Sequence, residues 1–285
     1  MTPTQIKAAL GQLGGGASKR LGQHFLIDAK ALEVIVAAAD VHAGDRVLEV
    51  GPGLGVLTRA LLEKGAEVVA IEQDRRMVEY LVGKNSPLKI RGDAEGRGDI
   101  VHGDAVTIDW HTLIGEGKWK FVANLPYSIT SLALRKALWA LHPPQVTVVL
   151  VQREVAERAV SVADGSKHGK TSLLSLMVAL ACSSARVVHR VPPGAFFPPP
   201  KVDSAILQLI PMPWVERREK WGIEPEKIMA LAKRGFAHPR KFLISNLGLP
   251  EVRSILEKMD ISEKVRSEDL RPDEWAELTL RLSTR

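Results

Sequence analysis

The sequence contains a single cysteine, Cys182, and no hydrophobic run near the roughly 20 apolar residues that a membrane span needs. One cysteine excludes an internal disulfide, and its place in an apolar helical pattern predicts a core residue rather than a reactive thiol. The N-terminus has no hydrophobic core of the kind found in secretory signal peptides. We therefore expect a cytoplasmic protein with no membrane partner.

Acidic residues are missing before Asp28, so the opening stretch is as acid-poor as an organelle transit peptide. Its only basic residues, however, are Lys7, Lys19 and Arg20, and the glycines Gly14–Gly16 interrupt it. Because glycine-rich segments favour flexibility, we expect residues 1–20 to form a flexible basic arm.

The overall composition is that of an ordinary globular protein. Hydrophobic residues make up 45% and charged residues 25% of the 285 positions, enough for one large domain and a smaller one. The formal charge of +6 and the pI of about 9.4 suit a polyanionic partner. Many basic proteins bind no nucleic acid, so the charge alone does not identify that partner.

Strand and helix patterns alternate in the first half of the chain. The strand pattern Arg46–Val50 leads into a glycine-rich loop, a helix over Val56–Lys64 and a second strand at Glu67–Ile71. This spacing predicts a βαβ unit and therefore a parallel sheet. Asp28 is expected to cap an earlier helix.

Further strand patterns extend the expected sheet to seven strands, at Asp99–His102, Lys120–Ala123, Val146–Val151, Ala185–Val191 and Val202–Ile210. The last two flank a proline-rich loop and are predicted to form an antiparallel hairpin. Most of Gly83–Gly98 is predicted to be a surface loop, and Thr171–Cys182 a helix. Short amphipathic segments after Pro213 predict a small C-terminal all-helical domain. The expected fold is therefore α/β, with a Rossmann-like sheet followed by that helical domain.

The glycine loop has the spacing G-x-G-x-G at Gly51, Gly53 and Gly55, and Glu49 precedes it. A dinucleotide-binding fingerprint would have its last glycine where Val56 stands. The observed spacing favours the methyltransferase version of the fold, with S-adenosylmethionine (SAM) as methyl donor, over a dehydrogenase. Glycines at this point let the backbone and the following helix N-terminus approach a ligand closely.

Acidic side chains follow the next two predicted strands. Glu72 ends the second strand, where a carboxylate can accept both hydroxyls of a ribose. Asp104 follows the third strand, where it can accept from the adenine amino group of the cofactor. Because ligands of such sheets bind at the carboxyl ends of the strands, these residues predict a cofactor site rather than structural turns.

The fourth predicted strand ends in Asn124-Leu125-Pro126-Tyr127. Taken alone, this motif is as compatible with a turn and a buried tyrosine as with a binding site. Beside a SAM pocket, the Asn124 amide oxygen and the Leu125 carbonyl would accept hydrogen bonds from both N–H groups of a ring-conjugated amine. The nitrogen would then become pyramidal, with its lone pair no longer delocalised into the ring. Pro126 restricts the backbone, and Tyr127 offers a face for stacking worth about 1–3 kcal/mol per base. The motif thus predicts methyl transfer to such an amine, catalysed by positioning and electrostatics.

Four motifs resemble, in family order, those of the rRNA adenine N6-dimethyltransferases: Gly22–Leu26, Glu49–Thr58, Asn124–Tyr127 and Phe196–Ser204. The resemblance extends from about Lys19 to Leu247 and is strongest to the bacterial small-subunit enzymes. It implies dimethylation of two adjacent adenosines in the 3′-terminal hairpin loop of 16S rRNA, within the immature small ribosomal subunit. It also implies a monomer that uses SAM and no metal.

The same resemblance assigns residues and domains. It implies SAM contacts at His24, Leu26, Gly51, Gly53, Glu72, Asp104 and Asn124. It implies a catalytic set of Asn124, Leu125, Pro126, Tyr127 and Phe196, in which Phe196 holds the target base opposite Tyr127. The methyltransferase domain would span residues 21–212, and a helical rRNA-binding domain residues 213–285.

Two positions depart from the family pattern. His24 stands where the family usually has Asn, although an imidazole can still make one hydrogen bond. In Gly235–Leu243, His238-Pro239 replaces a polar-basic pair and is expected to shift a helix start to Pro239. The basic residues around this segment are Lys233, Arg234, Arg240 and Lys241. Alone they suggest a solvated helix face, whereas the resemblance favours contact with rRNA phosphates.

Two alternatives remain open. Antibiotic-resistance methyltransferases that act on a 23S rRNA adenine share the cofactor and Asn-x-Pro-Tyr motifs, but the tail with Asn246-Leu247 favours the small-subunit enzymes. A noncatalytic assembly or transcription factor would keep the fold only for RNA or DNA binding. The intact Gly51, Glu72, Asp104 and Asn124 argue against that alternative.

Overall fold

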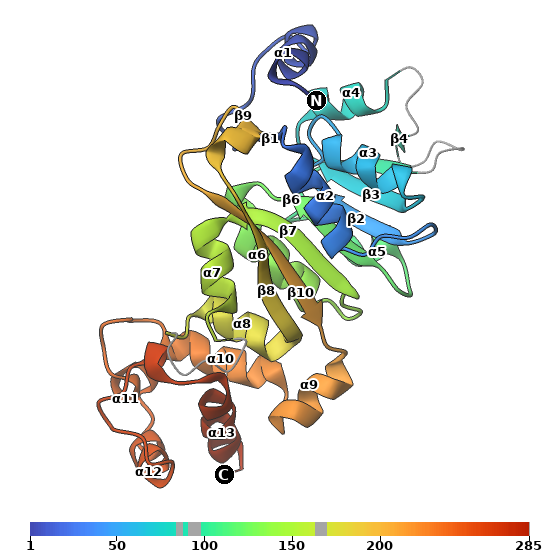
Figure 1. The fold of residues 1–285 in the computed structure, drawn as a ribbon. Coiled ribbons are helices and arrows are strands. Elements are labelled where there is room, and N and C mark those ends of the chain that lie inside the picture. Colours follow the sequence, from blue (N-terminus) through green and yellow to red (C-terminus); the bar gives the residue numbers. More distant parts are fainter. Residues whose placement is uncertain (84–87, 91–97, 163–169, 285) are drawn as a thin grey trace. The chain divides into compact units, whose positions relative to one another are not determined.

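The structure, a computed structural model, describes residues 1–83, 88–90, 98–162 and 170–284 and contains two compact units (Figure 1). Unit 1 comprises Met1–Ala156 and Arg186–Leu209, and unit 2 comprises Glu157–Ala185 and Ile210–Arg285. None of the helices in the described ranges combines the length and apolar character that crossing a bilayer requires.

An eight-stranded sheet has the strand order β4-β5-β3-β2-β6-β7-β10-β8. Its strands are β2 (Arg46–Val50), β3 (Glu67–Glu72), β4 (Leu88–Ile90), β5 (Gly98–His102), β6 (Lys120–Asn124), β7 (Val146–Gln152), β8 (Cys182–Val191) and β10 (Ser204–Pro211). Strands β2 to β7 pair in parallel, whereas β10 pairs antiparallel with β7. The seven predicted strands are all present, and the Rossmann-like class is confirmed.

The short edge strand β4 is an addition to the predicted seven. It pairs with β5 inside the segment that was predicted to be mostly loop, and the rest of that loop, residues 84–87 and 91–97, lies outside the described residues. The central strands are mostly apolar and buried because a parallel sheet is covered on both faces. In β7, for example, Val146 to Val151 are all buried.

Helices lie on both faces of the sheet (Figure 1). They are α2 (Ala29–Ala38), α3 (Val56–Glu63), α4 (Arg75–Leu81), α5 (Trp110–Ile114) and α6 (Thr130–Leu138), while α7 (Arg153–Val160) crosses the boundary between the units. The predicted cap is confirmed, since the Asp28 carboxylate accepts a hydrogen bond from Ala31 N at 2.7 Å.

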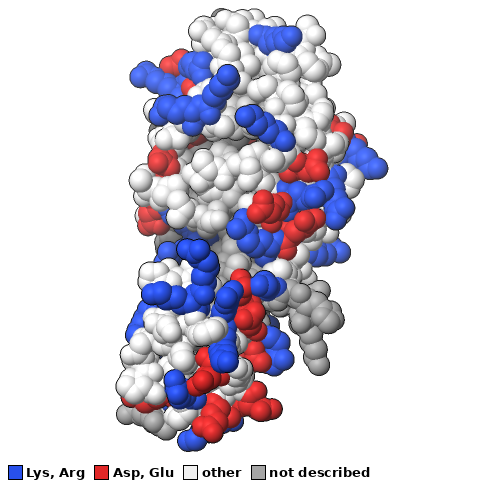
Figure 2. Space-filling model, turned by 90° about the vertical axis from the view of Figure 1, so that its left-hand side faces the viewer, with Lys and Arg blue, Asp and Glu red and all other residues white. Residues whose placement is uncertain are grey.

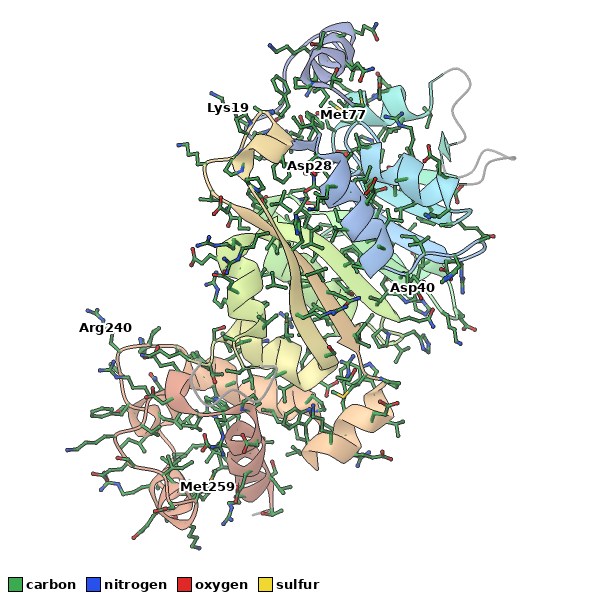
Figure 3. All side chains as sticks on the ribbon, viewed as in Figure 1. Lys19, Asp28, Asp40, Met77, Arg240 and Met259 are labelled. Carbon is green, nitrogen blue, oxygen red and sulfur yellow. The ribbon has the colours of Figure 1, made fainter. Side chains whose placement is uncertain are left out.

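The prediction of a flexible N-terminal arm differs from the structure, in which Pro3–Gln12 form helix α1. Thr2 and Gln5 form a reciprocal capping box at its start. Ile6 and Leu10 are buried in a cluster with Phe25, Leu54 and Met77, and Figure 3 shows Met77 close to α1. The helix forms because these apolar residues, one turn apart, find a hydrophobic surface to cover.

A two-stranded ribbon joins this region to the end of the sheet. Strand β1 (Phe25–Leu26) pairs antiparallel with β9 (Phe196–Phe197). Figure 1 shows this ribbon close to α1. Short 3-10 helices, η1 (Tyr127–Ile129) and η2 (Pro193–Ala195), precede α6 and β9 respectively.

Unit 2 is helical, and the predicted helix before Cys182 belongs to it. Its elements are α8 (Leu173–Ala181), α9 (Trp214–Trp221), α10 (Pro225–Gly235), α11 (Leu243–Leu247), α12 (Glu251–Lys258), η3 (Ser267–Asp269) and α13 (Pro272–Ser283). Helix α8 contacts α10 and α13 because it is apolar on nearly all sides. Cys182 is buried, and burial raises the pKa of its thiol to about 12, as expected of a core residue.

Candidate active site

A pocket opens at the carboxyl ends of the parallel strands of unit 1 and encloses about 1120 Å³ of empty space, its open mouth included. The residues implied as SAM contacts all line it: His24, Leu26, Gly51, Gly53, Glu72, Asp104 and Asn124. Leu125, Pro126 and Tyr127 line the same pocket. Among the described residues, no cluster of His, Cys, Asp and Glu is arranged to hold a metal ion. The fold thus brings the glycine loop, the strand-end acids and the Asn-Leu-Pro-Tyr motif into one site.

Gly51 brings the glycine loop against the Asn-Leu-Pro-Tyr motif. Its backbone has φ of 72°, and a Cβ atom there would lie 3.2 Å from Cδ of Pro126. Any larger residue would combine backbone strain with pressure on the proline ring. A ligand on the glycine loop and a group held by Asn124 are therefore neighbours.

Glu72 fastens the glycine loop from the next strand. Its Oε2 accepts from Gly53 N at 3.0 Å and its Oε1 accepts from Asp74 N at 2.8 Å, with only 5% of the residue exposed. Burial raises the pKa of this carboxyl, and the backbone donors oppose that rise. Each carboxylate oxygen has a second lone pair, so Glu72 can still accept hydroxyls of a sugar.

Asp104 has a simpler environment. Its Oδ1 accepts from Val106 N at 2.8 Å, which fixes the turn after β5. Within the described parts of the chain no hydrogen bond to its Oδ2 is found, so this oxygen can accept from a ligand amino group.

Glu49 is a pocket residue whose role the sequence left unassigned. It lies on β2 just before the glycine loop, is 1% exposed, and its Oε2 has no hydrogen-bond partner in the described structure. Burial, reinforced by the charge of Glu72 and opposed by the Thr58 hydroxyl, raises its pKa to about 8. A cationic group bound in the pocket would be a natural partner for this carboxyl, and the acidic residue directly before the loop was the available sequence signal.

Replacing Glu49 with Gln is expected to change how stability depends on pH. The Glu49 carboxyl keeps its proton in the folded protein up to about pH 8, because its pKa is raised to about 8 from the ordinary value of 4.5. The folded state therefore binds more protons between these values, and stability is full below about pH 4.5 and declines as pH rises through 8. The wild type should lose on the order of a few kcal/mol of unfolding free energy between these pH values, and Glu49→Gln should not. The measurement is urea unfolding at pH 5 and pH 8.5. The exposed control is Glu63→Gln, whose free energy of unfolding should depend on pH as in the wild type. If the free energy of unfolding of Glu49→Gln also changes with pH as in the wild type, this assignment is contradicted.

Asn124 has the orientation that an amine acceptor needs. Its Nδ2 donates to the His24 carbonyl at 3.2 Å, which leaves Oδ1 facing no donor within the described residues. The Leu125 amide donates to Leu150 O at 3.1 Å and ties the motif to β7. No described residue donates to the Leu125 carbonyl. Two acceptors are thus unengaged at the strand end.

Tyr127 is held at both ends. Its hydroxyl shares a hydrogen bond of 2.7 Å with the buried Ser204 hydroxyl, and burial raises the pKa of the phenol. The His24 ring stacks on Tyr127 with centroids 5.8 Å apart and planes at 25°, while its Nδ1 lies 2.7 Å from Pro198 O. Aromatic rings in contact have centroids about 4.5–7 Å apart, so no base fits between His24 and Tyr127 in this arrangement. The sequence predicts a cofactor contact for His24 and carries no signal for this stacking.

Phe196 is not brought into the pocket by this structure. It is 2% exposed, pairs with Leu26 across the β1–β9 ribbon, and is absent from the residues that line the pocket. Its role opposite Tyr127 stays a prediction.

The predicted basic cluster lies in unit 2, on α10 and the turn after it. Lys233, Arg234, Arg240 and Lys241 are all exposed, and Figure 3 shows Arg240 extending outward from the ribbon. Arg234 also donates to Leu247 O at 2.7 Å and caps the end of α11. The expected helix start at Pro239 was wrong.

The turn that replaces it has its own support. Asn246 Nδ2 donates to Gly235 O at 2.6 Å and to His238 O at 3.0 Å, and α11 begins only at Leu243. This side chain satisfies carbonyls that a continuous helix would otherwise bond internally. The turn thereby presents Arg240 and Lys241 to solvent.

Comparison with known proteins places this geometry in context. The model of the family "Ribosomal RNA adenine dimethylase" matches residues 16–283. The chain is 39% identical to a "Ribosomal RNA small subunit methyltransferase A" of Dehalococcoides mccartyi, over 93% of this chain and 88% of that protein. It is 38% identical to the protein of the same name from Synechocystis, over 93% and 96% of the two chains.

Two solved structures are similar over most of their length. The dimethyladenosine transferase from Plasmodium falciparum superposes with a TM-score of 0.70 and 26% identity, over 92% of this chain and 98% of that one. The 23S rRNA methyltransferase ErmE gives a TM-score of 0.63 and 25% identity, over 91% and 99%.

Proposed function

The chain belongs to the ribosomal RNA adenine dimethylase family, and we propose that it transfers methyl groups from SAM to N6 of two adjacent adenosines in the 3′-terminal hairpin loop of 16S rRNA. The observation that carries the proposal is the single pocket in which the glycine loop, Glu72 and Asp104 adjoin Asn124 and Tyr127. The names of the curated relatives support the small-subunit substrate.

The residues present fit SAM. The glycine loop offers backbone at close range, Glu72 and Asp104 offer acceptors for ribose hydroxyls and the adenine amino group, and Glu49 offers a carboxyl to a cation. His24 and Leu26, from the opposite side of the pocket, complete the proposed contacts. Bound SAM would supply an electrophilic methyl group on a sulfonium.

The acceptor side works by orientation. Asn124 Oδ1 and the Leu125 carbonyl accept hydrogen bonds from the two N–H groups of the adenine amino nitrogen. The lone pair of this nitrogen therefore points out of the plane of the ring and toward the methyl carbon. Pro126 holds the carbonyl in place, and the adenine stacks on the face of Tyr127 that His24 does not cover. Phe196 would bound the base from the other side after a side-chain rearrangement. Alignment of this kind lowers the barrier without a dedicated base.

The partner is proposed to be 16S rRNA within the immature small subunit. Lys233, Arg234, Arg240 and Lys241 would contact phosphates, and Arg234 also supports the turn that carries Arg240 and Lys241. We further propose that the protein acts in the cytoplasm as a monomer.

Methylation of unmodified small subunits with labelled SAM, followed by mass-spectrometric mapping, tests the function. We expect N6,N6-dimethyladenosine at two adjacent positions near the 3′ end of 16S rRNA. Product in 23S rRNA alone would favour the antibiotic-resistance specificity. Failure to bind SAM with RNA binding intact would favour a noncatalytic factor.

Replacing both Arg240 and Lys241 with Ala should weaken binding to small subunits and reduce its salt dependence. Each phosphate contact contributes about 0.7–0.9 to the slope of log K against log salt, so loss of two should lower the slope by about 1.5. The measurement is binding at several salt concentrations, with the exposed pair Lys227 and Lys258 replaced as control. An unchanged slope would count against RNA contact at this turn.

A further inference from the structure

We infer that the groove between α1 and β9 binds the nucleotide that adjoins the adenosine in the acceptor pocket, an inference that rests on the proposed rRNA methylation. The groove encloses about 650 Å³ of empty space, open solvent included. Its wall includes Lys7, Gly11, Gly15, Gly16, Phe197 and Pro198.

The groove and the acceptor pocket share one wall, the β1–β9 ribbon. Phe25 of β1 pairs with Phe197 of β9, and Phe197 lines the groove. Pro198 also lines the groove, while its carbonyl lies 2.7 Å from Nδ1 of the pocket residue His24. An RNA strand that places one base in the pocket therefore passes this ribbon, and the next nucleotide along the strand reaches the groove.

The groove has the chemistry that a nucleotide requires. The Lys7 ammonium lies 5.5 Å from the centroid of the Phe197 ring and has no carboxylate partner in the described part of the chain. The amides of Gly16 and Ala17 donate to no acceptor within the described residues, so they and Lys7 can bind a phosphate. Phe197 and Pro198 offer apolar surface to the base or ribose.

The charge around the groove favours a polyanion over other ligands. No Asp or Glu is among the lining residues. Lys19 and Arg20, on the segment that leads from the groove to the pocket, are exposed, and Arg20 lines the pocket itself. Figure 2 shows several Lys and Arg side chains on the upper part of the face that it presents.

The groove is built in advance of binding because α1 and the glycine turn are fixed. Ile6 and Leu10 anchor α1 in the core of unit 1. A Cβ at Gly15 would lie 2.9 Å from the Arg76 guanidinium, so the turn passes directly over that side chain. Arg76 in turn donates to the Asp74 carboxylate at 2.6 Å. Glycine at this position permits the close approach of the turn to Arg76.

Lys7→Ala tests the inference, with Lys7→Arg as the conservative variant. Lys64→Ala is the matched control, an exposed lysine of unit 1 at the end of α3 that faces the amino ends of the strands. For methylation of unmodified small subunits, Lys7→Ala should raise KM about five- to tenfold at unchanged kcat and lower the salt slope by about 1, since one phosphate contact is lost. Lys7→Arg should restore both, and SAM affinity by calorimetry should match the wild type in all variants.

Ultraviolet cross-linking of the wild-type protein to small subunits, followed by mass spectrometry, locates the ligand. We expect peptides with Lys7 or Phe197 joined to the nucleotide next to a methylated adenosine. Cross-links of these residues only to distant rRNA, or a Lys7→Ala enzyme equal to Lys64→Ala, would overturn the inference while leaving the proposed function intact. A wild-type enzyme that methylates no small subunit would instead contradict the function itself.

Discussion

Asn124→Ala is expected to lower kcat for methyl transfer by about 100- to 1000-fold, the range found when one preorganised polar group is removed from an active site. The reason is specific to its orientation: Nδ2 donates to the His24 carbonyl, so Oδ1 is the atom that meets the adenine amino group. Without it, one N–H bond loses its acceptor and the lone pair returns to the ring. The measurement is single-turnover methylation of unmodified small subunits.

Two companion variants separate chemistry from folding in this experiment. Asn124→Asp keeps an acceptor oxygen but cannot donate to His24, so it should retain more activity than Asn124→Ala. Ser131→Ala, at an exposed position on α6 that does not line the pocket, should behave as the wild type. Binding to small subunits should be nearly unchanged in all of these variants, because the basic residues proposed to contact phosphates are other residues than Asn124. Equal losses of binding and catalysis would show that Asn124 is a structural residue.

Glu72→Ala is expected to weaken SAM binding by at least about 100-fold. A hydrogen bond to a charged group contributes about 1.5–3 kcal/mol, and two to a ribose would together account for that factor. The variant also removes the acceptor of Gly53 N and Asp74 N, which frees the glycine loop. Calorimetric titration with SAM is the direct measurement.

The control for Glu72 comes from the same strand. Glu67 begins β3 at the amino edge of the sheet and is exposed, so Glu67→Ala should bind SAM as the wild type does. Glu72→Gln keeps one acceptor oxygen and should fall between the wild type and Glu72→Ala. Unaltered SAM affinity in Glu72→Ala would remove this residue from the cofactor site.

Local patterns predicted which residues meet at the pocket. Gly51 follows strand β2, Glu72 ends β3 and Asp104 follows β5, and the carboxyl ends of parallel strands meet at one edge of the sheet. The seven main strands and the antiparallel end of the sheet likewise followed from hydrophobic runs and a proline-rich loop, whereas the spatial order of the strands came only from the structure. Edge strand β4 was missed because three residues carry too little periodicity to be recognised.

Helix α1 was not predicted, although the sequence contains signals for it. Thr2 at the cap, Pro3 at the first helical position, and the apolar spacing of Ile6 and Leu10 were present in the sequence. The glycines that follow suggested flexibility instead. The helix is stabilised by packing of Ile6 and Leu10 against Leu54 and Met77, which come from segments distant in the chain.

Periodicity and spacing within a few residues were enough to predict the fold class, the edge of the sheet where the pocket lies and the motif Asn124–Tyr127 that lines it. The tertiary structure alone decided that His24 stacks on Tyr127 and that Phe196 is buried, since β1 and β9 lie far apart in the chain. It also decided that α8 packs with the C-terminal helices. Contacts between distant segments depend on how whole surfaces fit together, and no local pattern records that.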